Sequence, residues 1–325
     1  MNLNFVADET DVLSRSPGAL ISALRENVAG VLLGKPEVVQ LAVVALLAEG
    51  HLLIEDSPGV GKTLLAKALA RSLACSFHRI QFTPDLLPSD LLGVSVYNQA
   101  AGAFVFQPGP LFAQVVLADE INRATPRTQS ALLEAMSEHQ VSLDGETRPL
   151  GPPFFVLATQ NPFEFEGTYP LPESQLDRFL MRLRIGYPAR EAELRVLTGH
   201  RDGEPVDRLD PVLSAVELTH LQERTRQVRV DNRLADYLLN LIDATRVHPE
   251  LYLGGSTRAA LGLYRAAQAL ALVEGRDYVT PDDVKRLARP VLAHRLLPRG
   301  ARSAGGGDPC EEVLDDILSR TPVPT

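Results

Sequence analysis

One short stretch of the chain combines the residue types and the spacing that can hold a phosphate group. An apolar run at residues 52–54 leads into a turn that ends in Gly61-Lys62-Thr63, and a helical pattern follows. Backbone N–H groups of such a turn can surround a β-phosphate, and the positive end of the following helix points at it. We expect Lys62 to reach the β- and γ-phosphates and Thr63 to ligate Mg²⁺. The residues predicted to bind the nucleotide in this stretch are Ser57, Pro58, Gly59, Val60, Gly61, Lys62, Thr63 and Leu64.

The turn departs from the phosphate-loop pattern G-x-x-x-x-G-K-[ST] at its first position, where Asp56 stands instead of glycine. Aspartate tolerates unusual backbone angles better than most residues do. The turn can therefore keep its shape, provided that the Asp56 carboxylate faces away from the phosphates. The alternative is a Gly-Lys-Thr helix start that binds no nucleotide, and the strand before the turn and the helix after it argue against that alternative.

Two carboxylates follow a second apolar strand pattern. Asp119 and Glu120 end this strand, the position expected for chemistry at the carboxyl end of a buried parallel strand. We expect Asp119 to hold the Mg²⁺ shell and Glu120 to orient and polarise an attacking water. An Asp-Glu pair after apolar residues is common by itself. Its distance of 56 residues from Thr63 (119 minus 63) makes the combination specific.

Three further polar residues stand where they could act on a nucleotide. Asn161 follows a strand predicted at residues 154–158 and could position the water or the γ-phosphate, although an Asn-Pro turn needs no ligand. Arg178 ends a short helix. It is either paired with an acidic neighbour or donated to the phosphate of an adjoining subunit, since a guanidinium suits developing phosphoryl charge. Arg258 lies in the first turn of a later helix and faces either nucleotide or solvent.

A parallel sheet would bring these residues to one edge, and the hydrophobic pattern predicts such a sheet. Five strand patterns with intervening helices indicate an α/β fold, a three-layer αβα sandwich. Hairpins are predicted near residues 94–107 and 140–150, and an ordinary surface role is the alternative for the first. The apolar residues 31–33 are either a wall for an adenine ring or simple packing.

The pattern changes after the last strand, which predicts a second, smaller all-α domain. From residue 214 onward no strand pattern is evident, and a helix near the C-terminus either docks or stays mobile. The predicted organisation is a flexible N-terminus at 1–14, the sandwich at 15–187, a linker at 188–211, the helical domain at 212–298 and a flexible tail at 299–325.

Composition limits the class of protein. The chain has 325 residues, of which 45% are hydrophobic and 22% charged, as in a soluble globular protein. A net charge of −9 argues against a broad nucleic-acid-binding surface. The positions of Cys75 and Cys310 suggest neither a disulfide nor thiolate metal binding. The start resembles no signal peptide and no apolar run is long enough to span a bilayer, so the cytoplasm is the expected location.

The motifs, taken in order, resemble those of the AAA+ ATPases over about residues 15–298. The run at residues 119–136 resembles the MoxR family in particular, as do residues 157–162 and 175–179. The two hairpins are similar to the insertions of the clade that includes magnesium chelatase motor subunits. In such proteins the helical domain is a lid on the nucleotide-binding sandwich.

This resemblance implies ATP hydrolysis with Mg²⁺ in a homo-oligomeric ring, expected to be a hexamer, with nucleotide at the subunit interfaces. It implies that Arg178 acts in trans and that Arg258 is the lid sensor. Gln81 and Arg123 could couple the nucleotide state to the pore or to the neighbour. The resemblance also implies chaperone-like remodelling of client proteins, often with partners that carry a von Willebrand factor A domain.

Three alternatives remain open at the level of sequence. The first is a magnesium chelatase-like motor subunit. The second is a motor that remodels nucleic acid, and the acidic balance of the chain argues against it. The third is a nucleotide-gated binding scaffold with little hydrolysis.

Overall fold

The structure is a computed structural model that describes residues 15–162, 167–199, 203–300 and 308–324. The N-terminal segment predicted to be flexible, residues 1–14, lies outside these ranges. Among the described helices, none combines the length and the apolar character needed to cross a bilayer.

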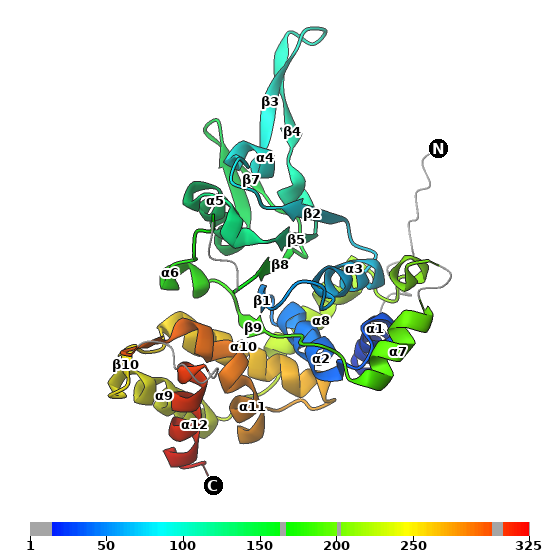
Figure 1. Cartoon of the computed structure of the whole chain (residues 1–325). Helices are drawn as coiled ribbons and strands as arrows, with labels where there is room; N and C mark the ends of the chain where they lie inside the picture. The colour runs from blue at the N-terminus through cyan, green and yellow to red at the C-terminus, as the bar shows by residue number, and fades with distance from the viewer. Residues whose placement is uncertain (1–14, 163–166, 200–202, 301–307, 325) are drawn as a thin grey trace.

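A parallel sheet at the centre of the molecule positions the residues singled out above (Figure 1). Its strands are β1 (Leu52–Glu55), β2 (Phe77–Gln81), β5 (Val115–Asp119), β8 (Phe155–Gln160) and β9 (Met181–Leu183). In the described part of the chain their order is β2-β5-β8-β1-β9. Because β5, β8 and β1 are parallel neighbours, their carboxyl ends meet at one edge. The predicted α/β fold with a five-stranded parallel sheet is confirmed.

Residues along these strands alternate between two hydrophobic clusters, one on each face of the sheet. Leu52 and Ile54 belong to the first cluster, whereas Leu53 and Val116 belong to the second. Successive side chains of a strand point to opposite faces, so an all-apolar strand is buried on both. The covering helices are α1 (Pro17–Val31), α2 (Pro36–Leu47) and α3 (Lys62–Ser72) for the first cluster, and α4 (Pro88–Leu92) and α5 (Pro126–Glu138) for the second.

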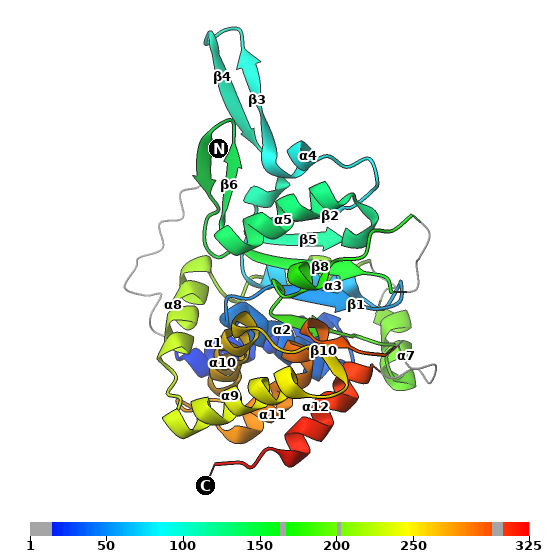
Figure 2. The ribbon, with the colours of Figure 1, turned by 90° about the vertical axis from the view of Figure 1, so that its left-hand side faces the viewer.

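Two hairpins project from the sandwich where the sequence predicts them (Figure 1 and Figure 2). They pair β3 (Gly93–Asn98) with β4 (Ala103–Pro108), and β6 (Gln140–Leu143) with β7 (Glu146–Pro149). Ser95 Oγ donates to Asp144 Oδ2 at 2.8 Å. The Arg148 guanidinium carbon lies 4.1 Å from the centroid of the Phe106 ring. These contacts hold the two hairpins together.

The chain after the sheet forms a helical lid domain, as predicted. Its helices are α8 (Ala215–Gln227), α9 (Asn232–Val247), α10 (Thr257–Val273), α11 (Pro281–Leu292) and α12 (Pro309–Arg320). Ser214 and Glu217 form a capping box at the start of α8, and Thr280 and Asp283 form one at the start of α11. Local capping therefore determines where these helices begin.

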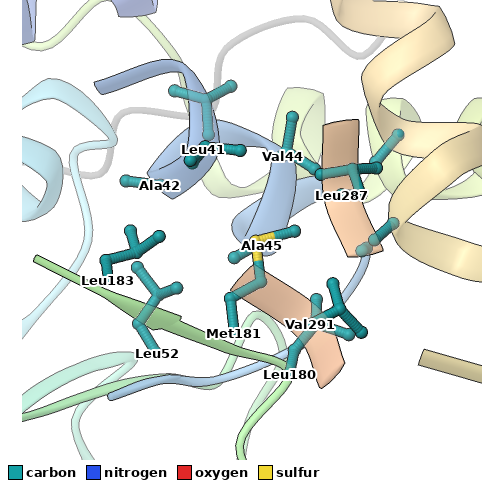
Figure 3. Close-up of a cluster of buried hydrophobic side chains, with 14 of the residues drawn as sticks. Leu41, Ala42, Val44, Ala45, Leu52, Leu180, Met181, Leu183, Leu287 and Val291 are labelled. Atoms are coloured by element: carbon teal, nitrogen blue, oxygen red, sulfur yellow. The ribbon is translucent and has the colours of Figure 1, made fainter. Parts of the chain in front are cut away.

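Helix α2 joins the sheet to the lid. Almost all of its residues are buried, and Pro36 occupies its first turn, where the missing N–H of proline costs no hydrogen bond. Figure 3 shows Val44 and Ala45 of α2 in one cluster with Met181 of β9 and Val291 of α11. The sandwich and the lid therefore share a continuous hydrophobic core.

The sequence did not predict one helix before the lid and two short strands within it. The segment predicted as a linker, residues 188–211, contains α7 (Arg190–Gly199). Ala192 is the buried residue of α7 within the described part of the chain. Because α7 is mostly exposed, it shows no hydrophobic period. The lid also contains two short paired strands, β10 (Leu251–Leu253) and β11 (Leu297–Pro298), which are too brief to produce a strand pattern.

The prediction of a flexible C-terminal tail is wrong for residues 309–320. They form α12, whose residues Cys310, Val313, Leu314 and Ile317 are buried against the rest of the lid. Their i, i+3, i+4, i+7 spacing is that of an amphipathic helix. The glycine-rich segment just before α12 lies outside the described residues.

Candidate active site

The phosphate loop connects β1 to α3. Gly59 and Gly61 have φ angles of 81° and 101°, which glycine adopts without a steric penalty. The N-cap residue of α3 is Gly61, which has no side chain to satisfy the first N–H groups of the helix. Lys62 Nζ donates to the Asp56 carbonyl oxygen at 2.8 Å. The loop therefore has the geometry of an anion site at a helix N-terminus.

The Asp56 side chain is turned toward the end of β9. Its Oδ2 accepts hydrogen bonds from the N–H groups of Ile185 at 2.7 Å and Gly186 at 2.6 Å, and its Oδ1 accepts from Ser57 N at 2.8 Å. Asp56 is not among the described non-glycine residues with positive φ. The expectation that its carboxylate faces away from the phosphates agrees with these contacts.

Asp119 and Glu120 share a contact with the buried Thr159 of β8. Thr159 Oγ1 donates to Asp119 Oδ1 at 2.6 Å and accepts from Glu120 N at 2.9 Å. Glu120 has a φ of 58°, a conformation that is uncommon for a residue with a side chain. Thr159 on the neighbouring strand therefore fixes the Asp119 carboxylate and the backbone of Glu120.

Strand β2 supplies the side chains of Arg79 and Gln81 to these carboxylates, and Arg123 contributes from the turn after β5. Gln81 Nε2 donates to Glu120 Oε2 at 2.7 Å, and Arg123 Nη1 donates to the same oxygen at 3.0 Å. Arg79 donates to Asp119 Oδ2 through Nε at 3.1 Å and Nη2 at 2.7 Å. The sequence singled out Gln81 and Arg123 but missed Arg79. The signal for Arg79 is its position two residues before Gln81, which places both on one face of the strand.

Most of the predicted residues line one cavity of about 600 Å³, a volume typical of small-molecule sites. The members of the predicted set on its wall are Pro58, Gly59, Val60, Gly61, Lys62, Thr63, Leu64, Asp119, Glu120 and Asn161. Among the described residues predicted for this site, Ser57 is not on that wall. The hydroxyl of Thr63 and the carboxylate of Asp119 provide oxygen atoms, the ligand type that Mg²⁺ prefers.

Apolar residues also line this cavity. Val31, Leu32 and Leu33, the residues proposed as an adenine wall, lie on it at the end of α1. Pro188, Val196 and Val206 line it as well. Sequence reasoning missed this second group, because it lies in the segment that was predicted to be a linker.

Arg178 and Arg258 lie together in a different cavity of about 240 Å³. Within the described residues, neither of them lines the cavity that contains Lys62. Arg178 Nη1 donates to the Leu133 carbonyl at 2.7 Å and to Ser137 Oγ at 2.9 Å, both on α5. The structure thus brings the two predicted arginines together but not to the phosphate loop of their own chain.

The suggested pairing of Arg178 with an acidic neighbour is not what the structure shows. The adjacent carboxylate, Asp177, instead forms an ion pair with Arg295 of the lid, with 3.3 Å between Oδ1 and Nε. The recorded contacts of the Arg178 guanidinium are with a carbonyl and a hydroxyl. Its charge therefore remains suited to an incoming anion.

Comparisons with known proteins agree with this geometry. Residues 51–181 match the family described as "ATPase family associated with various cellular activities (AAA)", and residues 243–317 match the AAA lid domain. The lid match reaches into α12. Helix α12 is thus part of the lid rather than an appended tail.

Similar proteins cover almost the whole chain. It is 48% identical over 305 residues to the uncharacterized protein YeaC of Bacillus subtilis, which covers 94% of this chain and 95% of that protein. It is 44% identical over 303 residues to the chaperone MoxR1 of Mycobacterium tuberculosis, which covers 90% and 80%. A crystal structure of an ATPase candidate from Cytophaga hutchinsonii superposes with a TM-score of 0.87 at 38% identity and covers 95% of this chain and 96% of that one. The chain belongs to the MoxR family of AAA+ ATPases.

Proposed function

We propose that this protein hydrolyses ATP in the cavity at the carboxyl edge of the sheet, with Mg²⁺ as its cofactor. The observation that carries the proposal is that Lys62, Thr63, Asp119 and Glu120 line one cavity, although they come from two separate parts of the chain. A phosphate-binding lysine, two oxygen ligands and a carboxylate base are the parts that phosphoryl transfer to water requires. Membership of an ATPase family supports the same reaction.

Each residue has a distinct role in this proposal. Thr63 and Asp119 would hold Mg²⁺, which when bound neutralises charge on the phosphate oxygens. Lys62 stabilises the charge that develops on the transferred phosphoryl group. Glu120 orients and polarises the attacking water, and Asn161 hydrogen-bonds the water or the γ-phosphate.

The site is completed by a neighbouring subunit. Arg178 and Arg258 share a cavity away from the phosphate loop of their own chain, so they would serve the phosphates of the next subunit in a ring, expected to be a hexamer. A guanidinium that reaches developing phosphoryl charge can supply a factor on the order of 10³ or more in rate.

The work done by hydrolysis is proposed to be the remodelling of a client protein. A relative that is 44% identical is named a chaperone. The paired hairpins extend from the sandwich, and the tip of the first carries the exposed apolar side chains of Tyr97 and Phe104. Rotation of the lid against the sandwich would move these hairpins. Proteins with a von Willebrand factor A domain are proposed as partners in this remodelling.

Replacing Glu120 with glutamine tests the proposal. The amide keeps the shape of the side chain but cannot act as a base, so we predict that ATP binding is retained while steady-state turnover falls by about 100-fold or more. The matched control is Glu134→Gln, which changes an exposed glutamate on α5. Normal turnover by the Glu120→Gln protein would remove Glu120 from this role.

A further inference from the structure

The lid holds the backbone on both sides of Arg178. Arg295, which follows α11, donates through Nη2 to the Phe179 carbonyl at 2.7 Å and to the Asp177 carbonyl at 3.4 Å. Arg295 is only 5% exposed. His294 adds a second contact, in which Nε2 donates to the same Phe179 oxygen at 3.1 Å. A buried part of the lid thus determines where the Arg178 segment lies.

The start of α10 is tied to the same segment. Ser256 Oγ donates to the Asp177 carboxylate, at 3.1 Å to Oδ1 and 3.0 Å to Oδ2. The same hydroxyl accepts from Ala259 N at 3.0 Å and so caps α10. Arg258 is the second residue of that helix. Asp177 directly precedes Arg178, and its carboxylate binds the turn that carries Arg258.

The Arg295 side chain passes close to α10 and has little room to move. A Cβ atom added at Gly262 of α10 would lie 2.9 Å from Arg295 Nη1, so glycine makes room for the guanidinium. Burial lowers the pKa of Arg295 to about 10, although the Asp177 carboxylate opposes this shift and the charge of Arg258 adds to it. A buried ion pair such as that of Asp177 with Arg295 often adds little net stability. We therefore interpret it as a contact that orients these side chains.

We propose that Asp177 is a positioning residue that makes Arg178 and Arg258 one unit. Its carboxylate binds Ser256 and Arg295 at the same time, so that the two arginines keep a fixed spacing when they approach the phosphates of the next subunit. The inference rests on the proposed trans role of Arg178. A displacement of about 1 Å at a reacting group can cost on the order of 100-fold in rate.

Two substitutions weaken the unit without removing either arginine. Asp177→Asn keeps the size of the side chain but removes its charge, and we expect kcat to fall about 10- to 100-fold while the KM for ATP changes little. Ser256→Ala removes both the contact with the Asp177 carboxylate and the cap on α10, with an expected loss of about 5-fold in rate. Ser256→Thr keeps the hydroxyl and should retain the rate. The matched control is Ser214→Ala, which removes a serine cap from α8 but has no recorded contact with Asp177 among the described residues.

Mixed rings separate positioning from a merely structural role. In a mixture of Asp177→Asn and Lys62→Ala subunits, some interfaces combine an intact phosphate loop with an intact arginine unit. We expect activity above that of either protein alone. A mixture of Asp177→Asn with the Lys62→Ala, Asp177→Asn double variant has no such interface, so its activity should not exceed the residual activity of the Asp177→Asn protein.

The mixture of Arg178→Ala with Lys62→Ala is the reference for these experiments. If it recovers activity but the Asp177→Asn mixture does not, the positioning role of Asp177 is overturned while the proposed function stands. If the Arg178→Ala mixture itself fails to recover, the trans role of Arg178 is wrong and the inference falls with it.

Discussion

The Asp56 carboxylate accepts hydrogen bonds from the backbone N–H groups of Ser57, Ile185 and Gly186. It therefore fastens the first position of the phosphate loop to the end of β9. Asp56→Gly restores the common loop pattern but leaves these donors without their acceptor. An unsatisfied donor costs about 1–3 kcal/mol, so we predict that the free energy of unfolding falls by about 2 kcal/mol, as measured by urea denaturation.

Asp56→Asn is the control for this prediction, because it keeps one oxygen acceptor and should lose less stability. A glycine variant as stable as the parent protein would show that the three hydrogen bonds do not fasten the loop. The sequence predicts that the turn tolerates aspartate at position 56. It does not identify the groups that donate hydrogen bonds to the Asp56 carboxylate. Two of them, Ile185 and Gly186, lie about 130 residues away in sequence, and only the fold brings them to the loop.

At the scale of elements, His51 links the sheet to α5. Its Nδ1 accepts from Val156 N at 3.1 Å, and its Nε2 donates to the Met136 carbonyl at 3.1 Å, so the buried ring is neutral. Burial lowers the pKa of His51 from 6.5 to about 4, the hydrogen bond to Met136 opposes this shift, and the nearby His139 adds to it. The unfolded chain therefore binds a proton at a higher pH than the folded chain does.

This difference makes stability depend on pH in a definite direction. The contribution of His51 is fully present above pH 6.5 and is lost as the pH falls toward 4, with a total of up to about 3 kcal/mol. We predict that the His51→Gln variant loses stability less steeply between pH 6.5 and 5, by up to about 1 kcal/mol per pH unit. Denaturation curves at a series of pH values provide the measurement. Parallel pH dependences for the two proteins would contradict this assignment.

The elements themselves were largely predictable because their signals are local. Apolar runs predicted the strands of the sheet, and a cap such as Thr280 with Pro281 is a local signal of the same kind for the start of α11. The exceptions have physical reasons. Helix α7 buries too little surface to show a period, and the docking of α12 depends on the buried lid residues against which it packs.

At the scale of the whole molecule, the candidate site divides into two parts. The phosphate loop, Asp119, Glu120 and Asn161 could be predicted together, because strand ends of a parallel sheet meet at one edge. The location of Arg178 and Arg258 could not, since it depends on how the lid packs against the sandwich. The separation of the two arginines from the loop of their own chain is what makes assembly part of the proposed mechanism.

The measurement that tests this account most directly is the rate of ATP hydrolysis per subunit across a range of protein concentrations, with the mass in solution followed in parallel. If a neighbour supplies Arg178, the rate per subunit should rise with concentration as rings form, and the Glu120→Gln protein should assemble without turnover. A constant rate per subunit, measured where the mass is that of a single chain, would contradict the shared site.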